Sequence, residues 1–300
     1  FTIGDNEVGG VMEVLRQCAA AEEDEEEEGD RNGERLTVVR CGDVTDATWN
    51  IGIKGEHQRV NAELAIALCE SLVRQDPSPP PTKGGDCTVR IALENTIWPG
   101  RCQTLSLSPH LQIHCDGAHT EKSLEACTRW FHDTVSSRGD NTERILLFNC
   151  SHERNPVPLL RHLLQTSTQL PFSKVYFCRA DAERPSSVEK PTSSQLLALD
   201  MGIIPACANN NEGDAADKEE RSWQDTLARI WQVLQSREGG LSRVESGLAV
   251  SSAIDDIRTY ASDGAARVHV LAIGSLYIVG SVLRACDWNE EFADGKLLLP

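Results

Sequence analysis

Hydrophobic positions along the chain follow two different periods. The run "RILLFNC" (144–150) is continuously apolar, which is typical of a strand buried in a parallel sheet. Between Glu56 and Leu72 apolar residues instead recur at every fourth position, which predicts a helix. The two patterns alternate through most of the chain. They predict strands at 34–40, 103–107, 111–115, 144–150, 174–178 and 268–273, and helices at 56–72, 121–135, 157–164, 223–235, 248–261 and 275–286.

This alternation predicts an α/β fold with right-handed βαβ units and an open, mostly parallel sheet. The segments 103–107 and 111–115 are expected to form either a hairpin or two short strands. In sheets of this kind ligands bind beyond the carboxyl ends of the strands. Polar turns follow directly on three predicted strands, at 116–119, 149–155 and 274–275. We therefore expect these turns to share one edge of the sheet and to form a ligand site there.

Four stretches interrupt the periodic pattern. The acidic run "EEDEEEEGD" (22–30) is typical of a solvated loop. The segment "QDPSPPPTKGGD" (75–86) is rich in Pro and Gly and predicts an extended linker. Residues 180–195 and 207–220 are polar and are expected to be surface insertions.

Composition narrows the class of protein. The net charge of the 300-residue chain is −17, but no basic stripe is present, so a nucleic acid is not an expected partner. No run of eighteen apolar residues occurs, so no membrane span is expected either. The eleven cysteines are scattered without a CxxC pair. They are expected to be buried free thiols of a reducing compartment rather than a disulfide scaffold or a zinc site.

Two candidate binding residues lie before the expected sheet. Asn61 shares a helix face with His57, four residues earlier, and an amide can both donate to and accept from the edge of an adenine. The alternative is an ordinary polar helix residue. In "NTIWPGR" (95–101), a Pro-Gly turn holds Arg101 near Trp98, where a guanidinium can meet phosphate oxygens with paired hydrogen bonds. The alternative here is a surface Arg beside a stacked Trp.

Three more candidates follow strands. Asp116 in "DGAH" (116–119) occupies a place where a carboxylate commonly accepts from sugar hydroxyls, Gly117 allows close approach, and His119 enters a helix. An Asp turn is the alternative for Asp116. Ser275 at a helix start can help to bind a carboxylate or phosphate, or can only cap the helix.

Several familiar catalytic motifs do not occur in the sequence. There is no GxxxxGK[ST] and no GxGxxG, so neither familiar loop can cradle a triphosphate. GxSxG, HExxH and CxxC are also absent, and no metal ligands are expected within this chain.

Five sequence blocks nevertheless occur in a specific order. They are "GEHQRVNAELA", "WPGR", "DGAHT", "RILLFNCSHERNP" and "VHVLAIGSLYIVGSVL". Together they resemble the C-terminal part of eukaryotic folylpolyglutamate synthases, which are related to the Mur ligases. The resemblance runs over about residues 50–285, and the intervening insertions carry little of it.

The resemblance implies an amide ligase that uses ATP and Mg²⁺. ATP would phosphorylate the γ-carboxylate of a reduced folate, and the amine of L-glutamate would attack the acyl phosphate. By motif position, Asn61 would contact the adenine, Asp116 the ribose hydroxyls and Arg101 the triphosphate. The remaining matched positions would lie near the incoming glutamate or the reacting phosphate (His119 and Ser275), or would shape the pocket (His57 and Gln58).

The resemblance also implies a division into domains. Residues 1–76 would end a central ATP-binding domain, 77–90 would be a linker, and 91–300 would be a Rossmann-like C-terminal ligase domain. In the family the phosphate-binding loop, the magnesium ligands, a modified lysine and most of the folate site belong to the N-terminal half. We therefore expect this piece alone, part of a longer chain, to be inactive as a ligase.

One block departs from the family pattern, and two rival functions stay open. The family loop after the central strand is close to Asn-x-Thr-Gly-x-Arg-Asp, whereas the loop 149–155 keeps Arg154 and a hydroxyl but lacks the Gly and the acid.

The two rival functions are a dihydrofolate synthase fragment and a non-catalytic nucleotide or regulatory binding module of the same fold. A monomer in the cytosol, the mitochondrion or both is expected.

Overall fold

The computed structural model describes residues 2–3, 38–39, 48–75, 85–136, 142–166, 171–182, 190–201, 222–264 and 266–289. The chain divides into two compact units, Phe1–Ile97 and Trp98–Pro300. Each unit is described by itself below.

A six-stranded sheet forms the centre of the second unit, in the order β3-β4-β8-β5-β6-β7. Its first two strands form an antiparallel hairpin, and every other neighbouring pair is parallel. Strand β8, the last in the sequence, lies between β4 and β5, so the turns that follow these three strands are neighbours. The strands are β3 (Gln103–Ser108), β4 (Leu111–Cys115), β5 (Thr142–Phe148), β6 (Lys174–Arg179), β7 (Arg243–Ala249) and β8 (Arg267–Ile273).

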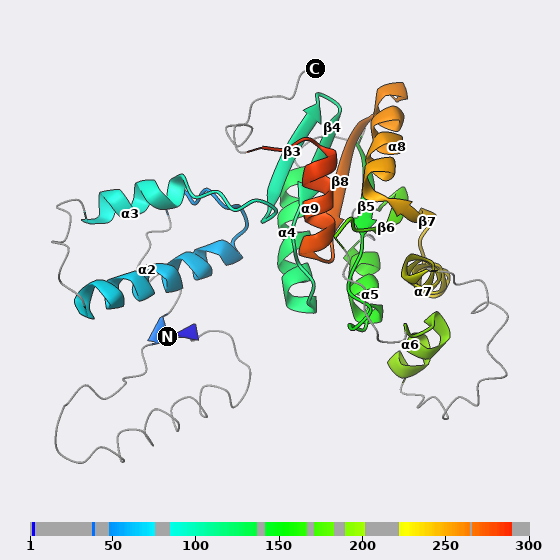
Figure 1. Ribbon diagram of the computed structural model, residues 1–300, viewed down its shortest axis with the longest axis horizontal. Helices are drawn as coiled ribbons and strands as arrows, with labels where there is room; N and C mark the ends of the chain where they lie inside the picture. The colour runs from blue at the N-terminus through cyan, green and yellow to red at the C-terminus, as the bar shows by residue number, and fades with distance from the viewer. Residues whose placement is uncertain are drawn as a thin grey trace, which may run out of the picture. The chain divides into compact units, whose positions relative to one another are not determined.

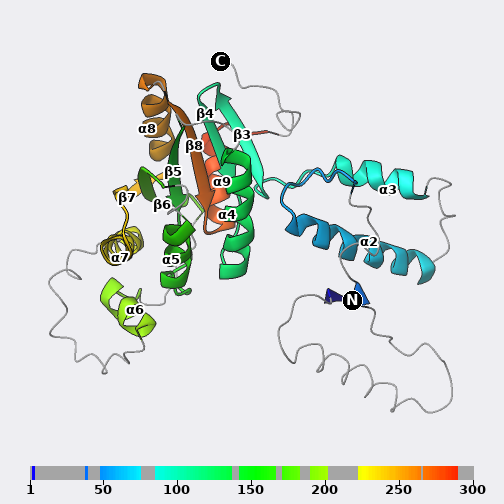
Figure 2. The same ribbon diagram turned by 180° about the vertical axis from the view of Figure 1, so that it is seen from behind.

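Helices cover both faces of this sheet, which makes three layers (Figure 1). One face packs against α4 (Glu121–Ser136), α5 (Val157–Thr166) and α7 (Trp223–Glu238). The other face packs against α8 (Val250–Asp263) and α9 (Leu276–Ala285). Helix α9 lies in front of the sheet in Figure 1, and α4 lies in front of it in the reverse view of Figure 2. The predicted α/β class with a mostly parallel sheet is confirmed.

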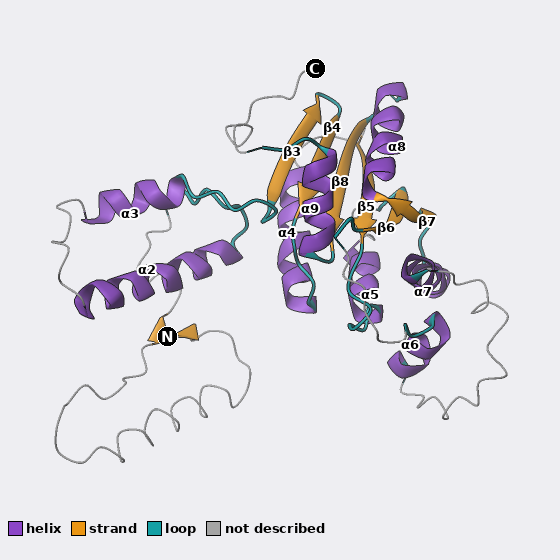
Figure 3. Cartoon of the chain, viewed as in Figure 1, coloured by secondary structure: helices purple, strands orange, loops and turns teal. Residues whose placement is uncertain are grey.

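Alternation within the central strands explains the two hydrophobic layers. In β5, Leu146 and Phe148 belong to the cluster under α4 and α5, whereas Ile145 and Leu147 belong to the cluster under α8 and α9. Side chains of a strand point alternately to opposite faces, so a strand buried on both faces must be apolar at every position. The continuous run in the sequence is therefore the signature of a central strand. Figure 3 shows the strands of the sheet with helices on both sides of them.

Local capping explains where several helices begin. Ser275 caps α9 by accepting from the Ile278 N–H, and Ser222 caps α7 by accepting from the Asp225 N–H. Helix α6 (Ser193–Asp200) begins with a reciprocal capping box between Thr192 and Gln195. Each cap satisfies backbone N–H groups that the first helical turn leaves without a partner.

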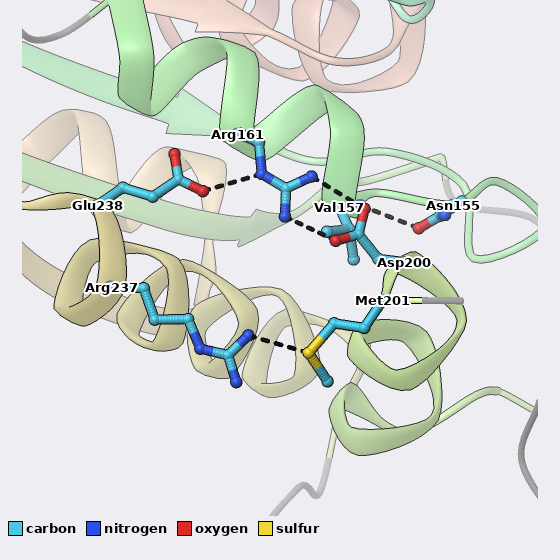
Figure 4. A network of polar contacts seen from close by, with 7 residues as sticks. All are labelled: Asn155, Val157, Arg161, Asp200, Met201, Arg237 and Glu238. Atoms are coloured by element: carbon cyan, nitrogen blue, oxygen red, sulfur yellow. Dashed lines mark hydrogen bonds and ion pairs between the residues drawn. The ribbon is translucent and has the colours of Figure 1, made fainter. Parts of the chain in front are cut away.

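Arg161 joins three helices on one side of the unit. Its guanidinium donates two hydrogen bonds to Asp200, 2.9 Å and 2.6 Å long, and its Nε donates to Glu238 Oε1 at 2.8 Å (Figure 4). The fork geometry of Arg matches the carboxylate with two parallel bonds. This network joins α5 to the C-terminal ends of α6 and α7.

The first unit contains two helices and a short strand pair among its described residues. Strands β1 (Thr2–Ile3) and β2 (Val38–Val39) are parallel. Helix α2 (His57–Gln75) confirms the helix predicted over 56–72, and α3 (Gly85–Glu94) follows it. Arg59 ties the preceding loop to α2 by donating to the Trp49 carbonyl at 2.7 Å.

Four described elements were not predicted from the sequence: strand β1, helices α3 and α6, and strand β7. Helix α3 occupies the end of the predicted linkers 75–86 and 77–90, which is a correction: the neighbouring prolines and glycines hid its start. Helix α6 takes up the end of the predicted insertion 180–195. Strand β7 has a mixed, half-exposed pattern because it is an edge strand, so it lacks the apolar run of the central strands.

Some predictions lie outside the described residues. These are the acidic loop 22–30, the insertion 207–220, most of the predicted strand 34–40, residues 76–84 and residues 183–189. Among the described residues, no helix is long and apolar enough to cross a membrane.

Cysteine thiols whose side chains are described are all free. Six of them are buried, as predicted, and Cys69 is exposed, which corrects the prediction for that residue. Burial raises the pKa of the Cys178 and Cys286 thiols to about 12, so both stay protonated at neutral pH.

Candidate functional site

The carboxyl ends of β4, β5 and β8 are joined by backbone hydrogen bonds. Asp116 N–H donates to the Ala272 carbonyl at 3.1 Å, and Asn149 N–H donates to Ile273 at 3.4 Å. Gly274 N–H donates to the Ala118 carbonyl at 3.0 Å. The three turns predicted to share one sheet edge therefore do so. We call this region, residues 116–119, 149–155 and 274–275 together with the turn 98–101, the carboxyl edge.

The turn Trp98–Arg101 is built by Gly100. Arg101 N–H donates to the Trp98 carbonyl at 3.1 Å, and Gly100 has φ of 76°, a value that L residues rarely adopt. With Pro99 before it, this is a type II turn. A Cβ at Gly100 would lie 2.4 Å from Val279 Cγ1, so the turn packs closely on α9. The Gly100 carbonyl also accepts from Gly117 N–H at 3.2 Å, which ties this turn to the turn after β4.

Arg101 lies over that second turn. A Cβ placed on Gly117 would be 3.1 Å from Arg101 Nη1 and 2.3 Å from Leu276 Cδ2. The Arg101 guanidinium carbon is 6.0 Å from the Trp98 ring centroid, within reach of a cation–π contact. Trp98 is 61% exposed and Leu276 is 49% exposed. The guanidinium thus sits beside a glycine between two exposed apolar side chains, and it is half-buried itself.

Asp116 is buried, with only 4% of its surface exposed. Its Oδ2 accepts from Cys102 N–H at 2.8 Å and from the Cys102 thiol at 3.4 Å. Its Oδ1 accepts from Ala118 N–H at 2.8 Å, which is an Asp turn. The Asp turn that the sequence analysis gave as the alternative for Asp116 is thus present. The predicted contact with ribose hydroxyls stays a prediction.

His119 has a defined tautomer. Its Nδ1 lies 2.8 Å from the Gly117 carbonyl oxygen, which can only accept, so Nδ1 carries the proton. In the neutral ring Nε2 is then the acceptor. His119 N–H donates to Ser123 Oγ at 3.1 Å, which fixes the residue at the start of α4. The half-buried imidazole can therefore accept a proton from a bound group.

Ser275 lies at the start of α9, on the same edge. Its Oγ accepts from Ile278 N–H at 3.2 Å, so the capping role is present. A hydroxyl that accepts this bond can still donate its own proton to a ligand. The N-terminus of a helix also favours negative charge. A carboxylate or phosphate placed here would meet both the Ser275 hydroxyl and the N-terminus of α9.

The loop after β5 brings in a residue whose contacts the sequence left open. Arg154 Nη1 donates to the His119 carbonyl at 3.4 Å, and Arg154 is exposed. Asn149 is buried and its Oδ1 accepts from Gln224 Nε2 at 3.3 Å, while the Cys150 carbonyl accepts from Trp223 Nε1 at 2.7 Å. The first part of the loop is therefore held by α7, and Arg154 lies at the carboxyl edge beside His119.

The remaining predicted residues belong to the first unit. Asn61 Nδ2 donates to Gln58 Oε1 at 2.9 Å, and Gln58 Nε2 lies 3.0 Å from His57 Nε2. These three residues form one connected row on the first turns of α2. Arg101, Asp116, His119 and Ser275 belong to the second unit, where the structure brings them to one edge.

In the part of the chain that the structure describes, no group of three or more His, Cys, Asp or Glu residues is placed to hold a metal ion. The carboxyl edge instead includes the buried carboxylate of Asp116, the guanidiniums of Arg101 and Arg154, the imidazoles of His119 and His152, and the hydroxyls of Ser151 and Ser275. This set of groups suits an anionic ligand and a proton transfer.

Comparisons with known proteins agree with the family resemblance. The chain is 28% identical to the mitochondrial folylpolyglutamate synthase of Homo sapiens, over 79% of this chain and 49% of that protein. It is 30% identical to the folylpolyglutamate synthase of Arabidopsis thaliana, over 78% of this chain and 46% of that protein. The chain thus spans about half the length of the curated relatives it matches. No protein-family model matches it.

A solved structure has a similar fold. The Mycobacterium tuberculosis folylpolyglutamate synthase, complexed with ADP and AMPPCP, superposes with a TM-score of 0.59 at 17% identity. The match covers 96% of this chain and 55% of that one. At this level of identity the likeness concerns the fold.

Proposed function

Because this chain is a relative of the folylpolyglutamate synthases, we propose that it forms the C-terminal part of an ATP-dependent ligase that adds L-glutamate to the γ-carboxyl group of reduced folates. The observation that carries the proposal is that Arg101, His119 and Ser275 lie on one edge of the sheet, in motifs that resemble those of that family. The substrates are ATP, a reduced folate and L-glutamate, and the protein works as a monomer in the cytosol or the mitochondrion.

Each residue has a role that fits its geometry. Arg101 contacts the triphosphate and stabilises the charge that develops as phosphate leaves the acyl phosphate. His119 Nε2 accepts a proton from the attacking amine, since Nδ1 is already committed to the Gly117 carbonyl. Ser275 donates a hydrogen bond to a carboxylate or phosphate oxygen at the start of α9. Asp116 contributes to nucleotide binding through the ribose.

In the same proposal the first unit supplies the adenine contacts. Asn61 reads the adenine edge, and its orientation is supported by the hydrogen bond to Gln58 Oε1. Gln58 and His57 shape the pocket beside it. Mg²⁺ would neutralise charge on the triphosphate, and its ligands are expected in a part of the enzyme that this sequence does not include.

Ligase assays of two proteins test the proposal. The first is this chain alone; the second is this chain joined to the reading frame that precedes Phe1. Both receive MgATP, tetrahydrofolate and labelled L-glutamate. We expect turnover only by the extended protein, because the chain contains no GxxxxGK[ST] loop. Turnover by the chain alone would overturn the expected inactivity.

Substrate variation separates the rival functions. Glutamate transfer to dihydropteroate in place of tetrahydrofolate would identify a dihydrofolate synthase. No transfer to either substrate by an extended protein that binds ATP would favour a non-catalytic binding module. Both outcomes contradict the proposal.

A further inference from the structure

Hydrogen bonds from within the protein engage both carboxylate oxygens of Asp116, and two of these bonds come from Cys102. One oxygen of Asp116 accepts from both the N–H and the thiol of Cys102, and the other accepts from Ala118 N–H. Both residues are buried, with 2% of Cys102 and 4% of Asp116 exposed. The carboxylate is therefore directed chiefly at the protein itself.

The donors lie next to the two candidate catalytic residues. Cys102 directly follows Arg101, and Ala118 directly precedes His119. One carboxylate thus holds the backbone beside the guanidinium and the backbone beside the imidazole. The bond from Gly117 N–H to the Gly100 carbonyl joins the same two turns a second time.

Backbone strain at Cys102 shows that this arrangement is enforced. Its φ is 42°, in the left-handed region that residues other than Gly, Asn and Asp seldom occupy. Such a conformation costs on the order of 1 kcal/mol or more and persists only where the surroundings hold it. Here the two hydrogen bonds to Asp116 hold it.

We propose that Cys102 and Asp116 form a positioning pair that sets Arg101 and His119 at the separation the site requires. The catalytic meaning of that separation rests on the proposed function, but the positioning itself does not. The pair assigns a role to Cys102, and it gives Asp116 a role besides the expected ribose contact.

The thiol is suited to this role because it remains a donor. Burial, followed by the charge of Asp116 and the hydrogen bond to it, raises the pKa of the Cys102 thiol well above its ordinary value. The thiol therefore keeps its proton at neutral pH and can donate to the carboxylate.

The test compares cysteine variants of this 300-residue chain. Cys102→Ala removes the thiol donor, Cys102→Ser retains a hydroxyl donor, and Cys178→Ala is the matched control. Cys178 is as deeply buried as Cys102 but lies on β6, away from Asp116. Cys102→Ala and Cys178→Ala should lose similar stability, so a thermal melt alone will not separate them.

Nuclear magnetic resonance supplies the readout that a structural role alone would not move. In Cys102→Ala we expect amide hydrogen exchange at Ala118 and Cys102 to become at least tenfold faster. The His119 ring and the Arg101 Nε–H signals should shift, with His110 as the exposed internal reference. Cys102→Ser should restore the native signals. Cys178→Ala should leave all of them unchanged.

Asp116→Asn completes the series. The amide supplies one acceptor oxygen for two backbone donors, so the same amides should lose protection. If this variant does not fold, the cysteine variants still decide. Cys102→Ala spectra that match those of Cys178→Ala at Ala118, His119 and Arg101 would overturn the proposal. None of these readouts requires ligase activity, so failure of the proposed function is detected separately.

Discussion

His114 and His269 share a hydrogen bond between the neighbouring strands β4 and β8. His114 Nε2 lies 3.0 Å from His269 Nδ1, and the two rings stack with an interplanar angle of 25°. Both side chains are buried, with exposed fractions of 0% for His114 and 1% for His269. Trp130 and Phe131 of α4 pack against the His114 ring in T-shaped arrangements, with interplanar angles of 71° and 75°. Since β4 leads to Asp116 and β8 leads to Gly274, this bond joins two of the three strands that lead to the carboxyl edge.

Replacing either imidazole should destabilise the protein. His114→Leu or His269→Leu leaves the other ring without this buried bond, which costs about 1–3 kcal/mol of the free energy of unfolding. The double variant should lose less than the sum, with a coupling of about 0.5–3 kcal/mol. Chemical denaturation measures all four proteins. Additive losses would contradict the coupling, and exposed His110→Ala is the control with an effect under about 0.5 kcal/mol.

The Arg161 network should make stability depend on acid pH. Hydrogen bonds from Arg161 hold the pKa of the Asp200 carboxyl below its ordinary value of 3.8, against the opposite effect of burial. Because the folded pKa is depressed, this stabilisation is complete above about pH 4 and is lost as the pH falls below it. Arg161→Gln should therefore destabilise the protein at pH 7 by about 1–3 kcal/mol and less at pH 3.

Denaturation curves at pH 7, 5 and 3 check that prediction. Arg129→Gln is the matched control, since its exposed pair with Glu125 should contribute well under about 1 kcal/mol. An equal loss for Arg161→Gln at all three pH values would show that Asp200 does not provide the pH dependence.

Gly117→Ala should disturb Arg101 more than it disturbs the fold. The new methyl group would lie 2.3 Å from Leu276 Cδ2 and 3.1 Å from Arg101 Nη1. Because Leu276 is half-exposed and can move, we expect a stability loss near the low end of the usual 1–3 kcal/mol for overpacking. The guanidinium must move as well, so affinity for inorganic tripolyphosphate, used as a probe, should fall several-fold by calorimetry.

Gly280→Ala is the matched control in α9. A Cβ there meets nothing within 4 Å, so this variant should gain up to about 1 kcal/mol from helix propensity and bind the probe unchanged. Equal probe affinities for both variants would place the anion away from Arg101.

Gly274→Ala should be the most damaging of the three glycine changes. Gly274 has φ of 113°, and a Cβ would lie 2.5 Å from the Asn149 carbonyl oxygen, which is backbone and cannot move aside. Strain and overpacking together should cost more than about 2 kcal/mol. A melting temperature within a few degrees of the native value would contradict this close approach of the β5 and β8 ends.

Sequence reasoning was accurate where periodicity is strong. The central strands are buried on both faces and the helices have one apolar side, so β5, β6, β8, α4 and α9 all appear near their predicted bounds. It failed at β7 and α3. An edge strand such as β7 need not be apolar, and the apolar spacing of α3 is short and starts at a pair of glycines.

The candidate site shows the same division. The sequence indicated which turns end on the sheet edge, because parallel strands present their carboxyl ends together. It did not indicate that Arg154 reaches the His119 carbonyl, since the two lie 35 residues apart in the chain. Nor did it single out Cys102, whose importance depends on a left-handed backbone and on the direction of the Asp116 carboxylate.

By itself, then, the sequence determined the α/β class, the central strands and the three turns at 116–119, 149–155 and 274–275 that share the carboxyl edge, because burial imposes periods that can be read along the chain. Only the tertiary structure decided which polar atoms of those residues are already bound to the protein and which are available to a ligand. Hydrogen bonds between the Arg101–Cys102 turn and the Asp116–His119 turn commit the Asp116 carboxylate, and a local carbonyl selects the tautomer of His119. Such contacts depend on distances and angles of a few tenths of an ångström, which the spacing of residues in a sequence does not carry.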